Sequence, residues 1–165
     1  MTILGFALAL LMFAGQPPGA GKAASEYDKT VDFAKYRTYK WSHAPEDYRP
    51  KVHDLLVADI DKEMAALGFT KTEDPKADLT LRYFTLRSSQ IDLKQLEKAE
   101  REGRKDKPTS YDMGKLVVVL RETSTDRRVW AANTQEYMNP DVAKREETIR
   151  QAVAKVFQTY PKPKK

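Results

Sequence analysis

Few side chains in this sequence are of the types that catalyse reactions or bind metals, and their spacing favours neither role. There is no cysteine, which excludes disulfides, thiolate metal ligands, cysteine nucleophiles and a lipid-modified cysteine. The two histidines, His43 and His53, are ten positions apart, so they lack the spacing of a helical metal-binding pair. We expect each to be a lone surface histidine, and we predict no catalytic, cofactor-binding or metal-binding residue and no cofactor.

Other catalytic motifs are also missing from the sequence. It contains no glycine-rich phosphate-binding loop and no Gly-x-Ser-x-Gly elbow of a serine hydrolase. Carboxylates are abundant, with pairs such as Asp28 with Asp32 and Glu146 with Glu147. Acid–base catalysis needs one member of such a pair to have a displaced pKa, and sequence spacing does not reveal that.

The chain carries a net charge of +5, with 29 basic residues interleaved with 24 acidic ones. Such interleaving is typical of a solvated mixed surface, although anionic lipid or nucleic acid are conceivable partners. The best candidate for a weak polyanion contact is the cluster of Arg101, Arg104, Lys105 and Lys107. Acidic residues are mixed into this cluster and no aromatic residue accompanies it, so we favour a solvated loop and expect no specific nucleic-acid recognition.

The first 23 residues are typical of a signal peptide. Ile3 to Ala14 is an uncharged apolar run of twelve residues, shorter than the ~20 that span a bilayer, and proline and glycine residues follow it. We predict cleavage after Ala23 or Ala24 and export to the periplasm or beyond. Met1-Thr2 lacks the expected basic residue, and a buried N-terminal helix or an uncleaved anchor is the alternative.

The clearest structural signal in the remaining chain is a β-hairpin. Leu116 to Leu120 is an uninterrupted apolar run rich in β-branched residues, and a second β-prone run covers Val129 to Ala132. All residues from 122 to 126 tolerate turns. We expect an antiparallel hairpin on which the other elements pack, with Trp130 in the core.

Further strands and two helices are indicated by periodicity. Residues 37–41 and 77–87 alternate like strands, and a shorter strand is expected at 27–31. The aromatic residues near 36–41 either fill the sheet or form a stacking platform for bases or sugars. Apolar residues recur at helical spacing over 52–67 and 141–160, which predicts two amphipathic helices.

These elements predict a single α+β domain over residues 24–161. We expect two layers, with an antiparallel sheet of about four or five strands and the two amphipathic helices packed on one face. A charged helix and loop are expected as an insertion at about residues 89–112. Residues 162–165 form a short basic tail.

Several short motifs follow one another along this domain: Tyr27, Asp32-Phe33, Tyr36, Tyr39, Trp41, Gly68-Phe69, Ala77-Asp78-Leu79, Gly114-x-Leu116, Val129-Trp130, Phe157 and Tyr160-Pro161. In this order and spacing the chain resembles, from about Ser25 to Pro161, the bacterial envelope lipoproteins grouped as domain of unknown function 4136. The resemblance implies an exported α+β domain, usually lipid-anchored, and no established activity. This sequence departs from the pattern because it lacks the lipid-accepting cysteine, which favours a periplasmic or secreted protein without a lipid anchor.

Three classes of function are compatible with these observations. The first is a non-enzymatic envelope protein that binds an unknown partner or surface through a sheet face, an edge strand or the charged loop. The second is an envelope-associated hydrolase whose carboxylates are gathered by the fold from distant positions. The third and least favoured is a polyanion binder that uses the basic surplus.

Overall fold

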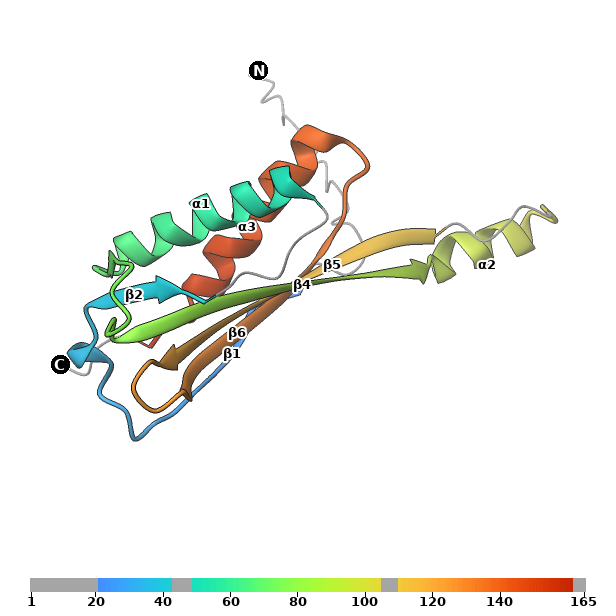
Figure 1. Ribbon diagram of the computed structural model, residues 1–165. Helices are drawn as coiled ribbons and strands as arrows, with labels where there is room; N and C mark the ends of the chain where they lie inside the picture. Colours follow the sequence, from blue (N-terminus) through green and yellow to red (C-terminus); the bar gives the residue numbers. More distant parts are fainter. Residues whose placement is uncertain (1–20, 43–48, 105–109, 162–165) are drawn as a thin grey trace, which may run out of the picture.

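The computed structural model describes residues 21–42, 49–104 and 110–161 of the chain. In chain order the described elements are β1 (Ala24–Tyr27), the 3-10 helix η1 (Phe33–Lys35), β2 (Thr38–Trp41), α1 (Pro50–Ala66), β3 (Thr70–Lys71), β4 (Leu79–Ile91), α2 (Leu93–Arg101), β5 (Ser110–Glu122), β6 (Arg127–Tyr137) and α3 (Val142–Phe157). They form the two layers visible in Figure 1.

Strands β5 and β6 form the predicted hairpin and pair antiparallel. Every second side chain of β5 points toward the helices, and Leu116, Val118 and Leu120 are buried there. This alternation is typical of a strand with one face on a core. Trp130 on β6 is fully buried, so its predicted place in the core is confirmed. Asp126 has a positive φ of 53° in the turn, a conformation that aspartate tolerates better than most residues.

The sheet has six strands in the order β1-β6-β5-β4-β2-β3. The prediction of four or five antiparallel strands was therefore wrong in number and partly in direction. Strand β2 runs parallel to β4 and to the short β3. Helix α1 lies between β2 and β4 in the chain and provides the crossover that parallel neighbours need, whereas a tight turn would have reversed the direction.

The first strand also lies earlier than predicted. The sequence suggested residues 27–31, but β1 covers Ala24–Tyr27 and pairs with β6. Asp28 ends the strand because its carboxylate accepts hydrogen bonds from the backbone N–H of Thr30, at 2.9 Å, and from the Thr30 hydroxyl, at 2.6 Å. This local turn competes with continued sheet pairing.

Helices α1 and α3 lie side by side on one face of the sheet, which confirms the two-layer α+β class (Figure 1). Pro50 opens α1, and Gly68, with φ +87°, follows its end in the left-handed conformation that glycine favours. The Asp141 carboxylate caps α3 by accepting a hydrogen bond from the backbone N–H of Lys144 at 3.2 Å. Both caps match the sequence signals at these positions.

The core fills the space between these helices and the sheet. The helices contribute buried apolar side chains along one stripe each, and the central strands contribute alternate residues. The main members are Leu56, Ile60, Met64, Leu79, Leu81, Tyr83, Leu116, Val118, Leu120, Trp130, Val153, Val156 and Phe157. Tyr36 and Tyr39 are buried as well, so these two rings fill the sheet and are not a stacking platform.

Strands β4 and β5 continue beyond the rest of the sheet and carry α2 at their far end (Figure 1). We call residues 89–104 and 110–112 the arm. The predicted insertion at about 89–112 is thus partly sheet, because Ser89–Ile91 and Ser110–Asp112 remain paired. The alternation of apolar and polar residues is weak in these two short segments, because both faces of the two-stranded arm are exposed to solvent.

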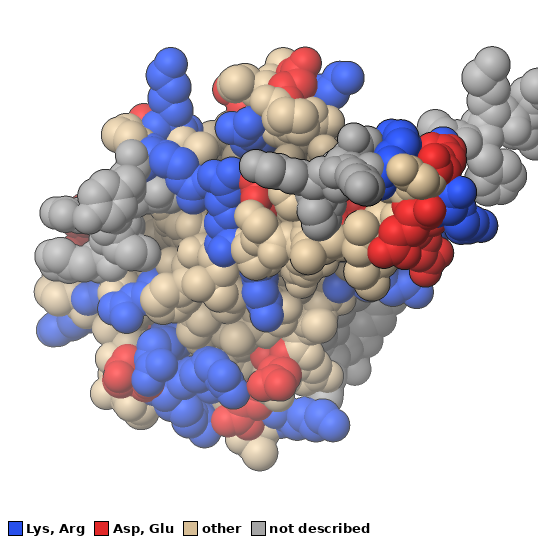
Figure 2. Space-filling model, turned by 90° about the vertical axis from the view of Figure 1, so that its right-hand side faces the viewer, with Lys and Arg blue, Asp and Glu red and all other residues tan. Residues whose placement is uncertain are grey.

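The opposite face of the sheet has no helix on it among the described residues. Phe84 and Leu86 lie on this face and are 40% and 62% exposed. Seen from the end that bears the arm, the surface mixes basic and acidic side chains with uncharged areas (Figure 2). No helix in the described part of the chain is both long and apolar enough to cross a membrane.

Candidate functional site

Among the described residues, the longest unpaired strand edge runs along β4 and continues into the arm. Strand β2 pairs with β4 only from Leu79 to Leu81, and β6 pairs with β5 only from Met113 onward. Within the described residues, the edge of β4 from Tyr83 to Ile91 therefore has no neighbouring strand on that side. Unpaired backbone N–H and C=O groups on such an edge are a ready template for another chain.

The arm also exposes large apolar side chains. Ile91 is 53% and Leu93 66% exposed, and α2 places Leu96 one turn after Leu93 on the same helix. Asp92 caps α2 by accepting a hydrogen bond from the backbone N–H of Gln95 at 3.1 Å. The helix is thus defined by local interactions, while its apolar residues remain without a core to bury them.

The structure covers only half of the predicted basic cluster. Arg101 lies 3.7 Å from Glu97 and Arg104 lies 2.9 Å from Glu102, so each faces an acidic side chain of the arm. Lys105 and Lys107 fall outside the described residues. A polyanion contact through this cluster is untested and stays a prediction.

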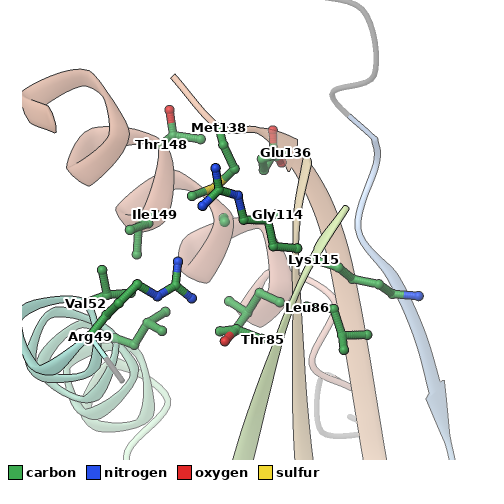
Figure 3. Close-up of a pocket in the computed structure, with 14 residues that line it drawn as sticks. Arg49, Val52, Thr85, Leu86, Gly114, Lys115, Glu136, Met138, Thr148 and Ile149 are labelled. Atoms are coloured by element: carbon green, nitrogen blue, oxygen red, sulfur yellow. The ribbon is translucent and has the colours of Figure 1, made fainter. Parts of the chain in front are cut away.

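A second candidate site is a cavity where the two helices diverge from the sheet (Figure 3). It measures about 60 Å³ and is lined mainly by apolar groups of α1, α3, β4 and β5, among them Val52, Leu56, Leu116, Ile149 and Ala152. Gly114 forms part of its lining, and a Cβ at that position would lie 2.5 Å from the sulfur of Met138. Because glycine has no side chain, the Met138 side chain has room to lie over the cavity.

The mouth of this cavity is basic. Arg49 and Arg87 line it, and the same two arginines line an adjoining polar pocket of about 310 Å³ that also contains Tyr111, Asp112, Tyr137 and Arg145. In Figure 3 the guanidinium of Arg49 points toward Gly114, whereas Lys115 points away from the cavity. Hydrogen bonds from Ser89 and Arg87 lower the pKa of Asp112, which therefore stays ionised and offsets one of the three arginines.

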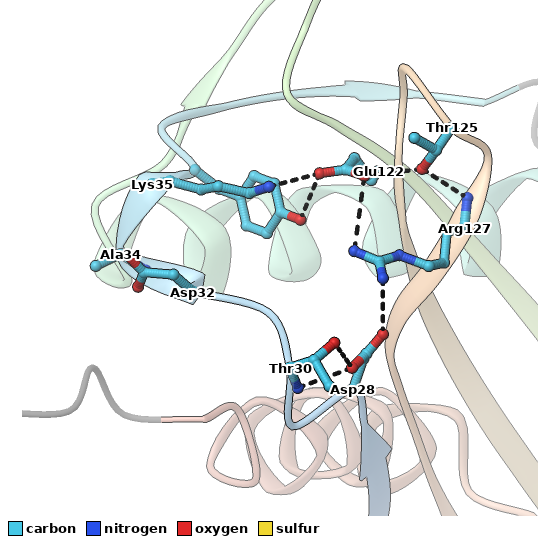
Figure 4. Close-up of polar contacts among 9 residues, drawn as sticks. Asp28, Thr30, Asp32, Ala34, Lys35, Glu122, Thr125 and Arg127 are labelled. Atoms are coloured by element: carbon cyan, nitrogen blue, oxygen red, sulfur yellow. Dashed lines mark hydrogen bonds and ion pairs between the residues drawn. The ribbon is translucent and has the colours of Figure 1, made fainter.

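A third polar cluster surrounds Glu122 at the opposite end of β5 (Figure 4). Its carboxylate accepts hydrogen bonds from Lys35 at 2.7 Å, Tyr36 at 3.0 Å and Thr125 at 2.8 Å. These hydrogen bonds lower the pKa of Glu122 to about 2. Since the partners come from the segment after β1 and from the β5–β6 turn, this cluster ties distant parts of the chain together.

Every described carboxyl group with a displaced pKa has a lowered pKa, whereas a general acid needs a raised one. Hydrogen bonds from Thr30 lower the pKa of Asp28. Burial raises the pKa of Asp78, but hydrogen bonds from the backbone of Arg37 and Thr38 outweigh burial and leave it lowered. A proton donor needs a raised pKa, so none of these four carboxylates is suited to act as a general acid.

The predicted lone surface histidine at position 53 is in fact held by a core residue. His53 Nδ1 lies 2.6 Å from the hydroxyl of Tyr83, because the start of α1 packs over β4. His43 falls outside the described residues. In the part of the chain that the structure describes, no group of three or more potential metal ligands occurs.

Several of the motif residues that carried the family resemblance gather at the end of the domain opposite the arm. The ring of Tyr160 meets those of Phe33 at 5.5 Å, Trp130 at 5.6 Å and Phe69 at 5.9 Å, all edge to face. Asp78 accepts hydrogen bonds from the backbone N–H groups of Arg37 and Thr38. The aromatic cluster and Asp78 fix strand order and helix docking, whereas the motif residues Gly114 and Leu116 line the apolar cavity.

The fold and its surfaces define a two-layer α+β domain with a mixed sheet and a projecting arm. The chain belongs to the family described as Domain of unknown function (DUF4136), whose model matches residues 23–162. This match confirms the resemblance inferred from the order of the motifs. A search of curated proteins found no match.

The solved structures that match this chain have low sequence identity to it. A PDZ domain protein from Parabacteroides distasonis has a TM-score of 0.60 at 15% identity. The matched region covers 87% of this chain and 36% of the Parabacteroides distasonis chain. This chain thus spans about a third of that protein. PelC from Paraburkholderia phytofirmans, solved as a dodecamer, has a TM-score of 0.50 at 13% identity, with coverages of 82% and 96%. A minor lipoprotein from Acinetobacter baumannii has a TM-score of 0.41 at 14% identity, with coverages of 74% and 87%.

Proposed function

We propose that this protein is an exported, non-enzymatic assembly module of the bacterial envelope, and that its arm is the contact surface. The observation that carries the proposal is the arm itself, a paired two-stranded extension with an unpaired edge and exposed Ile91 and Leu93. Exposed apolar side chains beside an open strand edge are typical of surfaces that meet another protein chain. The signal-like residues 1–23 and the family membership support export.

A second copy of this chain is the first partner to test, since the PelC structure of similar fold is a dodecamer. Multi-angle light scattering of the purified protein measures the assembly directly, and crosslinking mass spectrometry locates its contacts. We expect a mass above that of a monomer and crosslinks that involve α2. If the protein is monomeric, crosslinking in intact cells extends the same test to other envelope proteins.

The deciding variant is the double substitution Ile91→Ser and Leu93→Ser. It removes apolar contact area from the arm without touching the core, so the melting temperature should stay unchanged while assembly or crosslinking through the arm is lost. Val142→Ser is the matched control, because Val142 is equally exposed, at 63%, but lies on α3. If the arm variant keeps every crosslink and the native mass, the arm is not the contact surface.

A further inference from the structure

The cavity between the helices and the sheet combines an apolar interior with a basic mouth. Leu56, Leu116 and Ala152 are at least nine-tenths buried in its wall. One water molecule needs about 10–15 Å³ of cavity volume measured in this way. A cavity of about 60 Å³ therefore admits the end of an alkyl chain with about four carbon atoms. An apolar cavity with so few polar partners is unfavourable for water and favourable for a hydrocarbon.

The charges at the mouth are arranged to receive an anion. Arg49, Arg87 and Arg145 line the adjoining polar pocket together with one carboxylate, that of Asp112, to which Arg87 donates a hydrogen bond. Arg145 donates hydrogen bonds to the backbone carbonyls of Asn139 and Pro140, so its guanidinium is fixed in place. Guanidinium groups bind carboxylates and phosphates with paired hydrogen bonds.

The acidic residue in the cavity wall does not oppose such a ligand. Glu136 is 7% exposed, pairs with Lys155 at 2.7 Å and accepts a hydrogen bond from Thr134 at 3.0 Å. Its charge is therefore compensated within the protein. Gly114 on β5 pairs with Glu136 on β6 on one side and with Arg87 on β4 on the other. The carboxylate of Glu136 and the basic mouth therefore lie on opposite sides of the cavity floor.

We propose that this cavity binds a single-chain acidic amphiphile, with the end of an alkyl chain against Leu56 and Leu116 and an anionic head group held by Arg49 and Arg87. The ligand class is a free carboxylic acid with a short or medium acyl chain, because the cavity admits only about four carbon atoms. No residue of the arm lines the apolar cavity, so this inference holds whether or not the arm is a contact surface.

Octanoate is the probe, and isothermal titration calorimetry of the purified protein measures its binding. We expect saturable binding of octanoate, with octanol and inorganic phosphate each at least about tenfold weaker, because each lacks one half of the recognition. In a protein labelled at its methionine methyl groups, the NMR resonance of Met138 should shift with octanoate while that of Met64 stays in place. Equal binding of octanol, equal binding of phosphate, or an unmoved Met138 resonance would overturn the proposal.

Two variants separate the head from the tail. Arg49→Gln should weaken octanoate binding about tenfold through loss of a charge-assisted contact, whereas Arg82→Gln, on the opposite face of β4, should change it by less than about twofold. Val52→Phe fills the cavity and should abolish binding, whereas Val57→Phe on the same helix, outside the cavity lining, should retain it. Thermal melts establish that each variant folds. Octanoate binding that survives both Arg49→Gln and Val52→Phe in folded protein would place the ligand elsewhere.

Discussion

At the scale of single residues, Trp130 shows how an aromatic side chain holds this fold together without a polar anchor. Its ring lies 5.6 Å from those of Phe157 and Tyr160 and is fully buried. Among the described residues its indole N–H has no hydrogen-bond partner. The stabilisation therefore comes from packing and apolar burial.

Truncating Trp130 to alanine should lower the free energy of unfolding by about 3 to 5 kcal/mol, because a large cavity would open beneath α3. Chemical denaturation followed by circular dichroism measures the loss. Trp130→Phe keeps an aromatic ring in the site and should cost clearly less. A loss below about 1 kcal/mol for the alanine variant would mean that the ring is not packed as described.

Glu122 predicts how stability responds to acid. Its pKa lies near 2 in the folded protein, mainly because of the hydrogen bond from Lys35, and near its ordinary value of 4.5 in the unfolded chain. As the pH falls, the unfolded state takes up the proton first. The contribution of Glu122 is therefore complete above about pH 4.5 and is lost as the pH falls toward 2.

Denaturant midpoints measured from pH 6 to pH 2 test this linkage. The wild type should lose stability over the interval below pH 4.5, and Glu122→Gln should lose less over the same interval because it has no proton to take up. Glu97→Gln on the exposed face of α2 serves as the control and should follow the wild-type curve. Parallel curves for the wild type and Glu122→Gln would contradict the lowered pKa.

At the scale of elements, the arm and the body of the sheet differ in what stabilises them. Strand β5 has neighbours on both sides within the body and side chains buried against the helices, whereas α2 packs on no other described element to a comparable extent. An isolated helix of nine residues is only marginally stable in water. Its capping by Asp92 contributes about 1 kcal/mol, and its intrahelical ion pairs contribute a few tenths of a kcal/mol each.

Hydrogen exchange should reveal this difference directly. Backbone amides of α2 should exchange orders of magnitude faster than those of Val118 to Leu120, since local opening of α2 breaks no core contact. Mass spectrometry or NMR of the purified protein measures both segments together. Protection of α2 equal to that of β5 would show that another surface covers it, which crosslinking would then identify.

At the scale of the whole molecule, the charge surplus is spread out rather than concentrated. Many of the exposed arginines and lysines face a carboxylate, as Arg121 faces Asp126 at 2.7 Å and Arg128 faces Glu26 at 3.3 Å. The face seen in Figure 2 accordingly mixes both signs. Such a surface attracts polyanions weakly and through screened interactions.

Binding to a heparin column should therefore be weak, with elution below about 0.2 M salt. Replacing Arg101, Arg104, Lys105 and Lys107 together with glutamine should lower the elution salt only in proportion to the lost charge. Four substitutions of exposed basic residues on the body, at Lys29, Lys51, Lys62 and Arg82, are the matched control. Tight retention that only the arm substitutions remove would instead mark the cluster as a polyanion site.

The sequence by itself determined the local elements, because periodicity and caps depend on near neighbours. The amphipathic stripes of α1 and α3, the cap at Asp141, the left-handed Gly68 and the β5–β6 hairpin were all predictable, and the order of the motifs identified the family. Only the tertiary structure decided the parallel direction of β2 and the length of the arm, since pairing partners lie far apart in the chain. The cavity at Gly114 likewise escaped prediction, because Arg49, Arg87 and Met138 come together only when α1 and α3 settle on the sheet.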